Sequence, residues 1–121
     1  MPRILVVEDN DMILKAICAI LIRNGFNVET AYNGKEALEM TEKVDFSLVI
    51  TDLMLPYVNG LEIIQKLKSD ITKRNIKIID LSAIDNELTI SEAFKFGADD
   101  YILKPVVAIE LLNRVRKLLR S

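Results

Sequence analysis

The sequence has no histidine and no tryptophan, and only one cysteine, Cys18, in 121 residues. Without histidine, the chain can have neither a Ser-His-Asp or Cys-His catalytic arrangement nor a histidine-ligated zinc ion. A single cysteine cannot form an internal disulfide, which is typical of the reducing cytoplasm. Its apolar neighbours in AICAILI favour a buried and unreactive thiol. Any chemistry must therefore use carboxylates, hydroxyls and lysine.

The chain also lacks a strong excess of charge and a long hydrophobic run. Its 16 basic and 18 acidic residues give a net charge of −2, which argues against nucleic-acid binding through bulk charge. No uncharged apolar run is long enough to predict a membrane span, and MPRILVVEDN becomes acidic too early for a cleaved signal. With 50% hydrophobic residues, we expect one globular domain over residues 1–121, in the cytoplasm, without direct contact to nucleic acid or membrane.

Short apolar segments alternate with amphipathic segments along the whole chain. The β-branched apolar segments predict strands at 3–8, 27–31, 46–51, 76–82 and 100–104. The amphipathic segments predict helices at 12–25, 33–44, 60–70, 86–97 and 108–120. Five strand–helix units imply parallel strands joined by right-handed crossovers. The predicted fold is a doubly wound, flavodoxin-like α/β sheet of five parallel strands in the order 2-1-3-4-5, with helices on both faces.

Polar side chains stand where four of the predicted strands end. Glu8 and Asp9 end the first, Asp52 the third, Ser82 the fourth and Lys104 the fifth. In such sheets, sites form outside the carboxyl ends of the strands. Taken singly, these residues have ordinary explanations as a helix-capping loop, a strand-end hydroxyl and a solvated lysine. Their joint placement favours a site.

Carboxylates gathered at one edge repel one another, by roughly 4 kcal/mol for unit charges about 4 Å apart at an effective dielectric near 20. A hard divalent cation relieves this repulsion, and ligands that are all oxygen favour Mg²⁺, with Mn²⁺ as the alternative. Lys104 and the Ser82 hydroxyl suit the binding of a phosphoryl group. A carboxylate such as Asp52 can act as the nucleophile that forms an aspartyl phosphate. The pattern therefore predicts phosphoryl transfer.

These residues lie in the stretches ILVVEDN, AYNGKEALE, LVITDLMLPYVNGLEII, LSA, GADDYILKP and ELLNRVRKLL. Through them the chain resembles, over essentially its whole length, the receiver domain of bacterial two-component response regulators. The resemblance implies that Asp52 accepts a phosphoryl group from a sensor histidine kinase or phosphotransfer protein. It implies a Mg²⁺ ion held by Glu8, Asp9, Asp52 and the Met54 carbonyl, and phosphoryl contacts from Ser82 and Lys104. It also implies a cis Lys104–Pro105 bond.

In this family, signalling couples Ser82, the loop at 83–86 and an aromatic position that Tyr101 occupies. The implied output surface is the fourth helix, fifth strand and fifth helix, which would control a downstream protein or an output domain. Asp99, Asp100 and Arg114 resemble charges through which some members dimerise on that surface. The resemblance implies a signalling receiver that catalyses its own phosphotransfer and slow dephosphorylation, not a turnover enzyme. Because the chain ends directly after the last predicted helix, a stand-alone regulator and the start of a longer protein both remain open.

Three features depart from the family pattern. Asp80 lies within an apolar strand, where it is either at the rim or desolvated, and the sequence suggests no function for it. Met54 and Ile84 are apolar at positions that flank the phosphorylation site, which predicts slow hydrolysis. The apolar residues of the first helix and of the loop after the fifth strand predict a kinase docking patch: Ile13, Ala16, Pro105, Val106 and Val107. The alternative is that these apolar residues are exposed singly and without significance.

Three rival functions fit less well. An aspartate-nucleophile phosphatase of the haloacid dehalogenase type needs an acid two residues after the nucleophile, where this chain has Met54. A flavodoxin-like cofactor binder needs a phosphate-cradling loop after the first strand, where the acidic EDNDMI would repel phosphate. A receiver-like module that is never phosphorylated is the most serious rival, and the presence of Asp9, Asp52, Ser82 and Lys104 argues against it.

Overall fold

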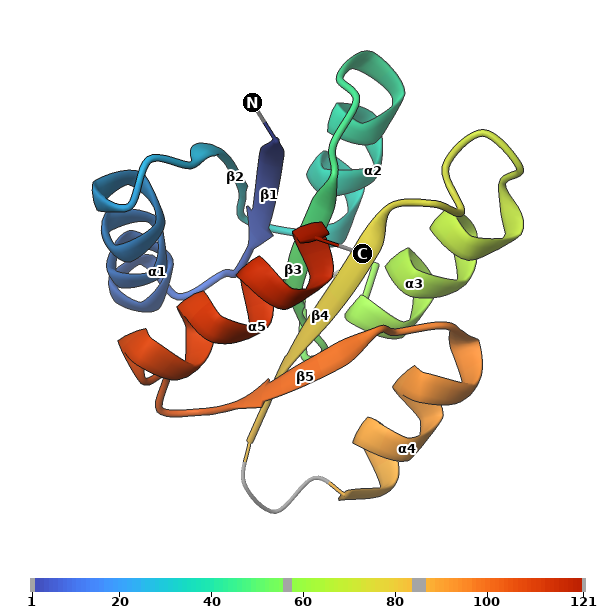
Figure 1. Ribbon diagram of the computed structural model, residues 1–121. Helices are drawn as coiled ribbons and strands as arrows, with labels where there is room; N and C mark the ends of the chain where they lie inside the picture. The colour runs from blue at the N-terminus through green and yellow to red at the C-terminus, as the bar shows by residue number, and fades with distance from the viewer. Residues whose placement is uncertain (1, 56–57, 84–86, 121) are drawn as a thin grey trace.

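A computed structural model of the chain describes residues 2–55, 58–83 and 87–120 (Figure 1). Strands and helices alternate in the predicted order, and each lies within a few residues of its predicted range. They are β1 (Arg3–Val7), α1 (Asp11–Arg23), β2 (Asn27–Ala31), α2 (Gly34–Lys43), β3 (Leu48–Asp52), α3 (Gly60–Ser69), β4 (Lys77–Ser82), α4 (Glu87–Phe96), β5 (Asp100–Leu103) and α5 (Ala108–Arg120). The third strand begins two residues later than the predicted apolar segment, at Leu48, and Asp52 ends it as expected.

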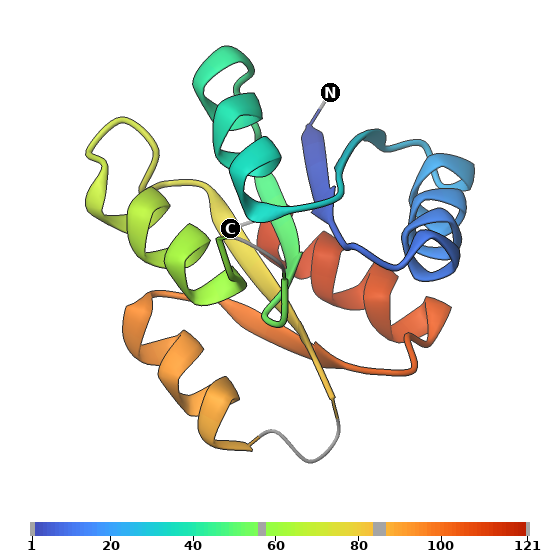
Figure 2. The same cartoon turned by 180° about the vertical axis from the view of Figure 1, so that it is seen from behind.

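The five strands form one parallel sheet in the order β2-β1-β3-β4-β5, which confirms the predicted topology. Helices α1 and α5 cover one face, and α2, α3 and α4 cover the other (Figures 1 and 2). Within the sheet, β2 lies on one side of β1, and β3, β4 and β5 follow in order on the other side of β1. The carboxyl ends of β1 and β3 therefore meet where the winding changes direction.

Three asparagines fix the starts of helices at the site edge and next to it. The side chains of Asn10, Asn33 and Asn59 each accept a hydrogen bond from the backbone N–H three residues later. Such N-caps satisfy one of the donors that a helix start leaves free. The capping role considered for the acidic loop after β1 is thus taken by Asn10, which leaves Glu8 and Asp9 for the site.

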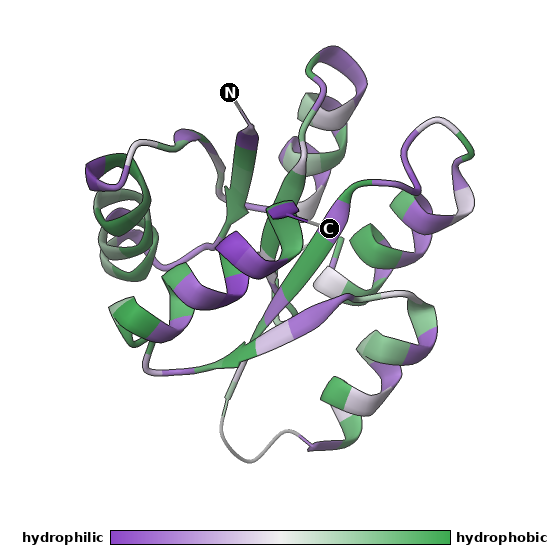
Figure 3. Ribbon diagram, viewed as in Figure 1, coloured by the Kyte–Doolittle hydropathy of each residue, from purple (hydrophilic) through white to green (hydrophobic). Residues whose placement is uncertain are grey.

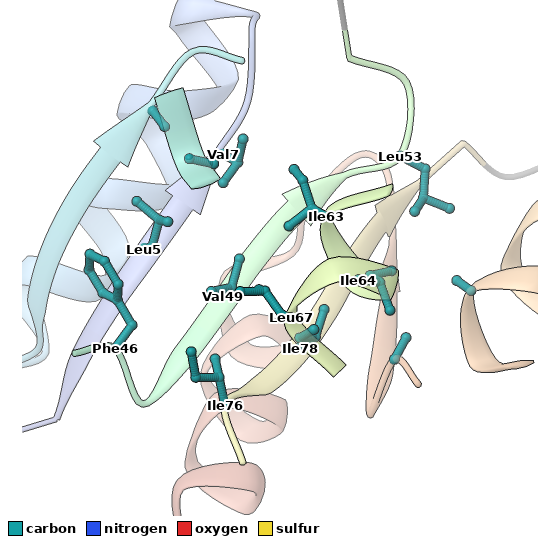
Figure 4. Packing of buried hydrophobic residues seen from close by; sticks show 14 residues of the cluster. Leu5, Val7, Phe46, Val49, Leu53, Ile63, Ile64, Leu67, Ile76 and Ile78 are labelled. Carbon is teal, nitrogen blue, oxygen red and sulfur yellow. The ribbon is translucent and has the colours of Figure 1, made fainter. Parts of the chain in front are cut away.

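The core consists of two apolar clusters separated by the sheet. The α1/α5 cluster is formed by Ile4, Val6, Leu14, Ile17, Leu21, Leu48, Ile50, Ile79, Leu81, Ile102, Leu111 and Val115. The α2–α4 cluster, shown in Figure 4, is formed by Leu5, Val7, Ala31, Ala37, Phe46, Val49, Leu53, Ile63, Ile64, Leu67, Ile76, Ile78, Ala93 and Ala98. Neighbouring residues of a strand belong to opposite clusters because side chains alternate across a sheet. Strands β1 and β3 are therefore mostly apolar, whereas β4 also carries polar residues, as Figure 3 shows.

Helices α1, α2, α3 and α5 are amphipathic and turn their buried apolar residues to the sheet, and the alternation of apolar and polar residues along them is visible in Figure 3. Complete burial of one leucine or isoleucine contributes about 1.5–3 kcal/mol, so the two clusters supply most of the driving force for folding. Within the described part of the chain, no helix combines the length and apolarity required to cross a bilayer.

Candidate functional site

Asp52 lies at the carboxyl end of β3 with only 5% of its surface exposed. Its Oδ2 accepts a hydrogen bond from Lys104 Nζ at 2.5 Å, and its Oδ1 accepts one from the Met54 backbone N–H at 2.9 Å. Helix α3 begins close to it, because a Cβ at Gly60 would lie 2.4 Å from the Asp52 carbonyl oxygen. Only glycine permits this approach, which presses the start of α3 against the backbone that carries the carboxylate.

Glu8 and Lys104 are held just beyond the ends of their strands by backbone hydrogen bonds. The Glu8 N–H donates to the Ala31 carbonyl at 3.1 Å, and the Lys104 N–H donates to the Ser82 carbonyl at 2.8 Å. By strand alternation, Glu8, Asp52 and Lys104 all point toward the same side of the sheet. In each case, the residue two positions earlier belongs to the α1/α5 cluster. These residues are Val6, Ile50 and Ile102. The fold itself therefore brings the three groups together.

The charge of Lys104 is shared between two acids. Its Nζ also lies 3.3 Å from Glu8 Oε2, and Glu8 is only 1% exposed. Burial, reinforced by the adjacent Asp52 carboxylate, raises the pKa of Glu8 to about 7, although Lys104 acts in the opposite direction. Burial lowers the pKa of Lys104, but its hydrogen bonds and charge interactions with Asp52 and Glu8 together outweigh this and leave the pKa above its ordinary value. One lysine thus does not fully neutralise the acids.

Glu8, Asp9 and Asp52 form a group that fits a metal ion. Each offers one carboxylate oxygen, and these oxygens all lie within 4.8 Å of one another. Asp9 is exposed while the other two are buried, so the group opens to solvent on one side. A donor set made only of carboxylate oxygens suits a hard divalent cation. The adjacent Asp52 carboxylate contributes to the raised pKa of Glu8, and a cation placed beside the two acids would relieve their repulsion.

Ser82 does not point its hydroxyl proton toward Asp52. Its Oγ donates to Asp80 Oδ1 at 2.8 Å, and the two side chains are 2% and 0% exposed. Both residues belong to β4 and lie two apart, on the face that carries the α2–α4 cluster. The expected phosphoryl ligand is therefore engaged with a neighbour on its own strand.

Asp80 is desolvated, which decides between the two placements that the sequence allowed. Burial raises the pKa of Asp80 to about 6, whereas the hydrogen bond from Ser82 acts to lower it and the charges of Asp100 and Asp52 act to raise it. Its Oδ2 has no hydrogen-bond partner among the described residues. Strand alternation in the sequence places Asp80 on the same side as Ser82, but the hydrogen bond between them was not predicted.

Tyr101 lies on β5 directly opposite Asp80 in the register. Its ring meets Phe94 of α4 edge to face, with 5.9 Å between ring centroids, and the Arg114 guanidinium lies 5.5 Å from the ring centroid. Tyr101, the aromatic residue of the predicted switch, is therefore half-buried on the edge strand, in contact with both α4 and α5.

The charges considered for dimerisation are paired within the chain. Arg114 Nη1 donates to Asp100 Oδ1 at 2.6 Å, and Lys68 Nζ lies 3.2 Å from Asp99 Oδ2. Asp99 also accepts the Ile78 backbone N–H at 2.8 Å, so it ties the start of β5 to β4. These residues have a structural role in the single chain.

An apolar pocket of about 420 Å³ lies between α1 and the loop after β5. It is lined by Ile13, Ala16, Ile17, Ile20, Lys104, Pro105 and Val106. Four of the five residues predicted for the docking patch line this pocket, while Val107 is exposed outside it. The sequence reasoning missed Ile17 and Ile20, which the helical spacing 13, 16, 17, 20 could have revealed.

Two further expectations have different outcomes. The Lys104–Pro105 peptide is cis, as the resemblance implied. Met54 projects into solvent with 71% of its surface exposed, next to the carboxylate that its backbone N–H contacts. Ile84, the second residue of the slow-hydrolysis prediction, and most of the predicted switch loop lie outside the described residues.

Comparison with known proteins agrees with this geometry. The family model for the response regulator receiver domain matches residues 4–116. Response regulator RR06 of Streptococcus pneumoniae is 36% identical over 117 residues, which are 97% of this chain and 52% of that protein. Response regulator ArlR of Staphylococcus aureus is 37% identical over 120 residues, 99% of this chain and 53% of that protein. The chain thus spans about half the length of the curated relatives it matches.

A solved structure shows the same architecture. The response regulator receiver domain protein (CheY-like) from Methanospirillum hungatei superposes with a TM-score of 0.92 at 31% identity, covering 99% of this chain and 94% of that one. The strand order, the acidic cluster beside Lys104 and the family match over nearly all of the chain lead to one conclusion. The chain belongs to the receiver domain family of two-component response regulators.

Proposed function

We propose that the chain is a phosphorylatable receiver in which Asp52 accepts a phosphoryl group in a Mg²⁺-dependent reaction. The observation that carries the proposal is the buried contact of Asp52 with Lys104, inside a group of three carboxylates. Glu8, Asp9, Asp52 and the Met54 carbonyl would hold the ion, with Mn²⁺ as the alternative. When bound, the ion would offset the negative charge of the acids and of the incoming phosphoryl group.

The residues of the site have separable roles in this reaction. One Asp52 oxygen attacks the phosphorus of the donor, the bond between phosphorus and the leaving atom breaks, and the leaving group keeps the electron pair. The Met54 N–H and Lys104 hold the carboxylate in place before the attack. Lys104 and the Ser82 hydroxyl would then contact the transferred phosphoryl oxygens. The site acts through positioning and charge, as phosphoryl transfer requires.

A sensor histidine kinase or phosphotransfer protein is the proposed donor, and the pocket beside α1 is its proposed docking site. The apolar lining by Ile13, Ala16, Pro105 and Val106 borders Lys104, so a partner seated there would reach the site. Val107, exposed nearby, would extend the contact. Because such a kinase uses ATP as its phosphate source, we propose that the reaction takes place in the cytoplasm.

Helix α4, strand β5 and helix α5 form the proposed output surface for a downstream protein or output domain. Tyr101 joins the two helices through Phe94 and Arg114, so a change at Ser82 could be passed to this surface. A homodimer through it stays a prediction, and intermolecular pairs of Asp100 and Arg114 would compete with their bond within the chain. We further propose that residues 1–121 fold as a single domain, because the strands form one sheet.

The test is intact mass spectrometry after incubation with Mg²⁺ and acetyl phosphate. We expect a single phosphoryl adduct on the unaltered protein and none on Asp52→Ala or after chelation of the metal. Asp11→Ala, which removes a nearby exposed acid outside the carboxylate group, is the matched control and should be phosphorylated normally. An adduct that persists in Asp52→Ala would show that another residue is the acceptor.

A further inference from the structure

The Ser82 hydroxyl is already committed to a partner in this structure. A serine hydroxyl carries one proton, and Ser82 donates it to Asp80 Oδ1 at 2.8 Å. The oxygens of a phosphoryl dianion can only accept hydrogen bonds. Ser82 must therefore leave Asp80 before it can donate to a phosphoryl group on Asp52.

Leaving Asp80 is costly because Asp80 has no substitute partner in the described structure. Its Oδ2 is unpaired, its Oδ1 is bonded to Ser82, and none of the ion pairs in the described parts of the chain includes it. A buried carboxylate that loses its hydrogen bond bears the full penalty of desolvation. With a pKa of about 6, Asp80 is mostly ionised at neutral pH, and ionised acceptors form the stronger bonds.

The position of Asp80 also gives it a place in the switch. In the register it lies between Thr51, which precedes the phosphoryl acceptor, and Tyr101 on the edge strand. An apolar side chain here would pack without any bond to Ser82, as Ile78 does two residues earlier on the same face. A half-paired carboxylate at this point has no stabilising role that we can identify.

From these contacts we propose that Asp80 is a positioning residue that holds the Ser82 hydroxyl away from Asp52, and so opposes formation of the phosphorylated state. The inference rests on the proposed function, since it concerns the same Ser82 and the same reaction. Release of this bond is a step that phosphorylation must drive. Replacement of Asp80 then makes the unphosphorylated chain readier to react.

A double-mutant cycle tests the proposal. The rate of adduct formation with acetyl phosphate and Mg²⁺ is measured for the unaltered protein, Asp80→Ala, Ser82→Ala and the double variant. We expect Asp80→Ala alone to react about tenfold faster, the size that one hydrogen bond to a charged group allows. With Ser82→Ala present, the same change should have less than about a twofold effect, because there is no hydroxyl to release. Ser82→Thr, which retains a hydroxyl, should restore the effect.

The rival explanation is that the negative charge of Asp80 simply repels the phosphoryl group. Asp80→Asn separates the two, because it removes the charge but keeps the shape and an oxygen that accepts from Ser82. A positioning role predicts a rate between those of the unaltered protein and Asp80→Ala. Equal acceleration by Asn and Ala that persists in Ser82→Ala would overturn the proposal. Thermal unfolding checks each variant, and the isosteric Asp80→Asn keeps the test valid if Asp80→Ala folds poorly.

The side-chain rotamer of Ser82 supplies a readout that needs no phosphorylation. Three-bond NMR couplings should show one rotamer in the unaltered protein and several in Asp80→Ala. An unchanged rotamer would overturn the proposal, as would an unchanged reaction rate in a chain that is phosphorylated on Asp52. If no variant forms an Asp52-dependent adduct, the proposed function itself fails and the role of Asp80 falls with it.

Discussion

The two faces of the sheet bury charge in different ways. On the face covered by α1 and α5, the acids Glu8 and Asp52 stand at the ends of their strands and share the cation of Lys104. On the face covered by α2, α3 and α4, Asp80 lies inside its strand, and its one hydrogen-bond partner among the described residues is the hydroxyl of Ser82. The first arrangement is a site open to a cation and a donor. The second is a buried charge that forms no ion pair within the described parts of the chain.

This difference shows that buried polarity in one small sheet can serve two purposes. Where buried anions share a cation and the exposed Asp9 opens their group to solvent, the charge is available for chemistry. Where an anion is enclosed and only one of its oxygens is hydrogen-bonded, as in Asp80, desolvation lowers stability, and the role that we propose for it is control of Ser82. Both faces are otherwise covered by buried apolar residues, so the effect of a substitution on one face can be compared with that of a matching substitution on the other.

The largest expected losses of stability come from truncating buried apolar side chains, which both faces of the sheet contain. Ile79→Ala on the α1/α5 side and Ile78→Ala on the α2–α4 side both remove a fully buried isoleucine. Each should lower the free energy of unfolding by about 3 kcal/mol. Urea unfolding measures both. Losses that differ by more than about 2 kcal/mol would contradict the view that the faces are equally packed.

Lys104→Met should break the charge balance of the first face. Glu8 and Asp52 would keep their burial but lose their cation, so we expect the free energy of unfolding to fall by about 2 kcal/mol in the presence of a chelator. Added Mg²⁺ should recover part of that loss by binding the folded acids. Lys66→Met on α3, for which the structure gives no ion pair among the described residues, is the control. If Lys104→Met leaves the free energy of unfolding unchanged, Glu8 and Asp52 must take up protons when the lysine is absent.

Val106→Asp should affect transfer from a partner while leaving the chemistry of the first face intact. A carboxylate in the pocket beside α1 should slow phosphotransfer from the cognate kinase about tenfold, because the apolar docking surface is lost. Phosphorylation by acetyl phosphate should be unchanged. Ile71→Asp, an equally drastic change at an exposed position after α3, should slow neither reaction. Loss of both reactions in Val106→Asp would instead indicate misfolding.

The smallest expected change is a gain of stability on the second face. Burial raises the pKa of Asp80 from 3.8 to about 6, so the folded chain binds this proton more tightly than the unfolded chain does. The free energy of unfolding should then fall as pH rises between these values, by at most about 3 kcal/mol from this group. Asp80→Asn removes this dependence. We expect it to add about 1 kcal/mol at about pH 7, because a buried amide N–H offsets much of the gain. At about pH 4, where the buried Asp80 is protonated, the cost of the amide remains without the gain, so the same change should destabilise the chain by about 1–2 kcal/mol.

Glu8 provides the internal comparison for that experiment. Its pKa is raised from 4.5 to about 7, so Asp80→Asn should retain a fall in stability over this higher range. Chemical denaturation at a series of pH values separates the two contributions. A pH profile of Asp80→Asn that matches the unaltered protein would show that Asp80 does not titrate in this range.

Much of the site could be read from the sequence because the fold that holds it is periodic. Alternating strands and helices specify a parallel sheet, and a parallel sheet brings the ends of its strands to one edge. Asp52, Glu8 and Lys104 were therefore expected together before any distance was known. The pocket was only partly foreseen, because Ile17 and Ile20 look like ordinary core residues of an amphipathic helix until the loop after β5 is placed against them.

What the sequence determined by itself is the topology, the two apolar clusters and the gathering of acids beside one lysine. All three follow from the spacing of residue types along the chain. What only the tertiary structure decided is where protons and hydrogen bonds go: that Lys104 serves two acids, and that Ser82 is bonded to Asp80. Residue spacing predicts which side of a strand a group faces, but burial and the choice among competing partners depend on the whole packed sheet.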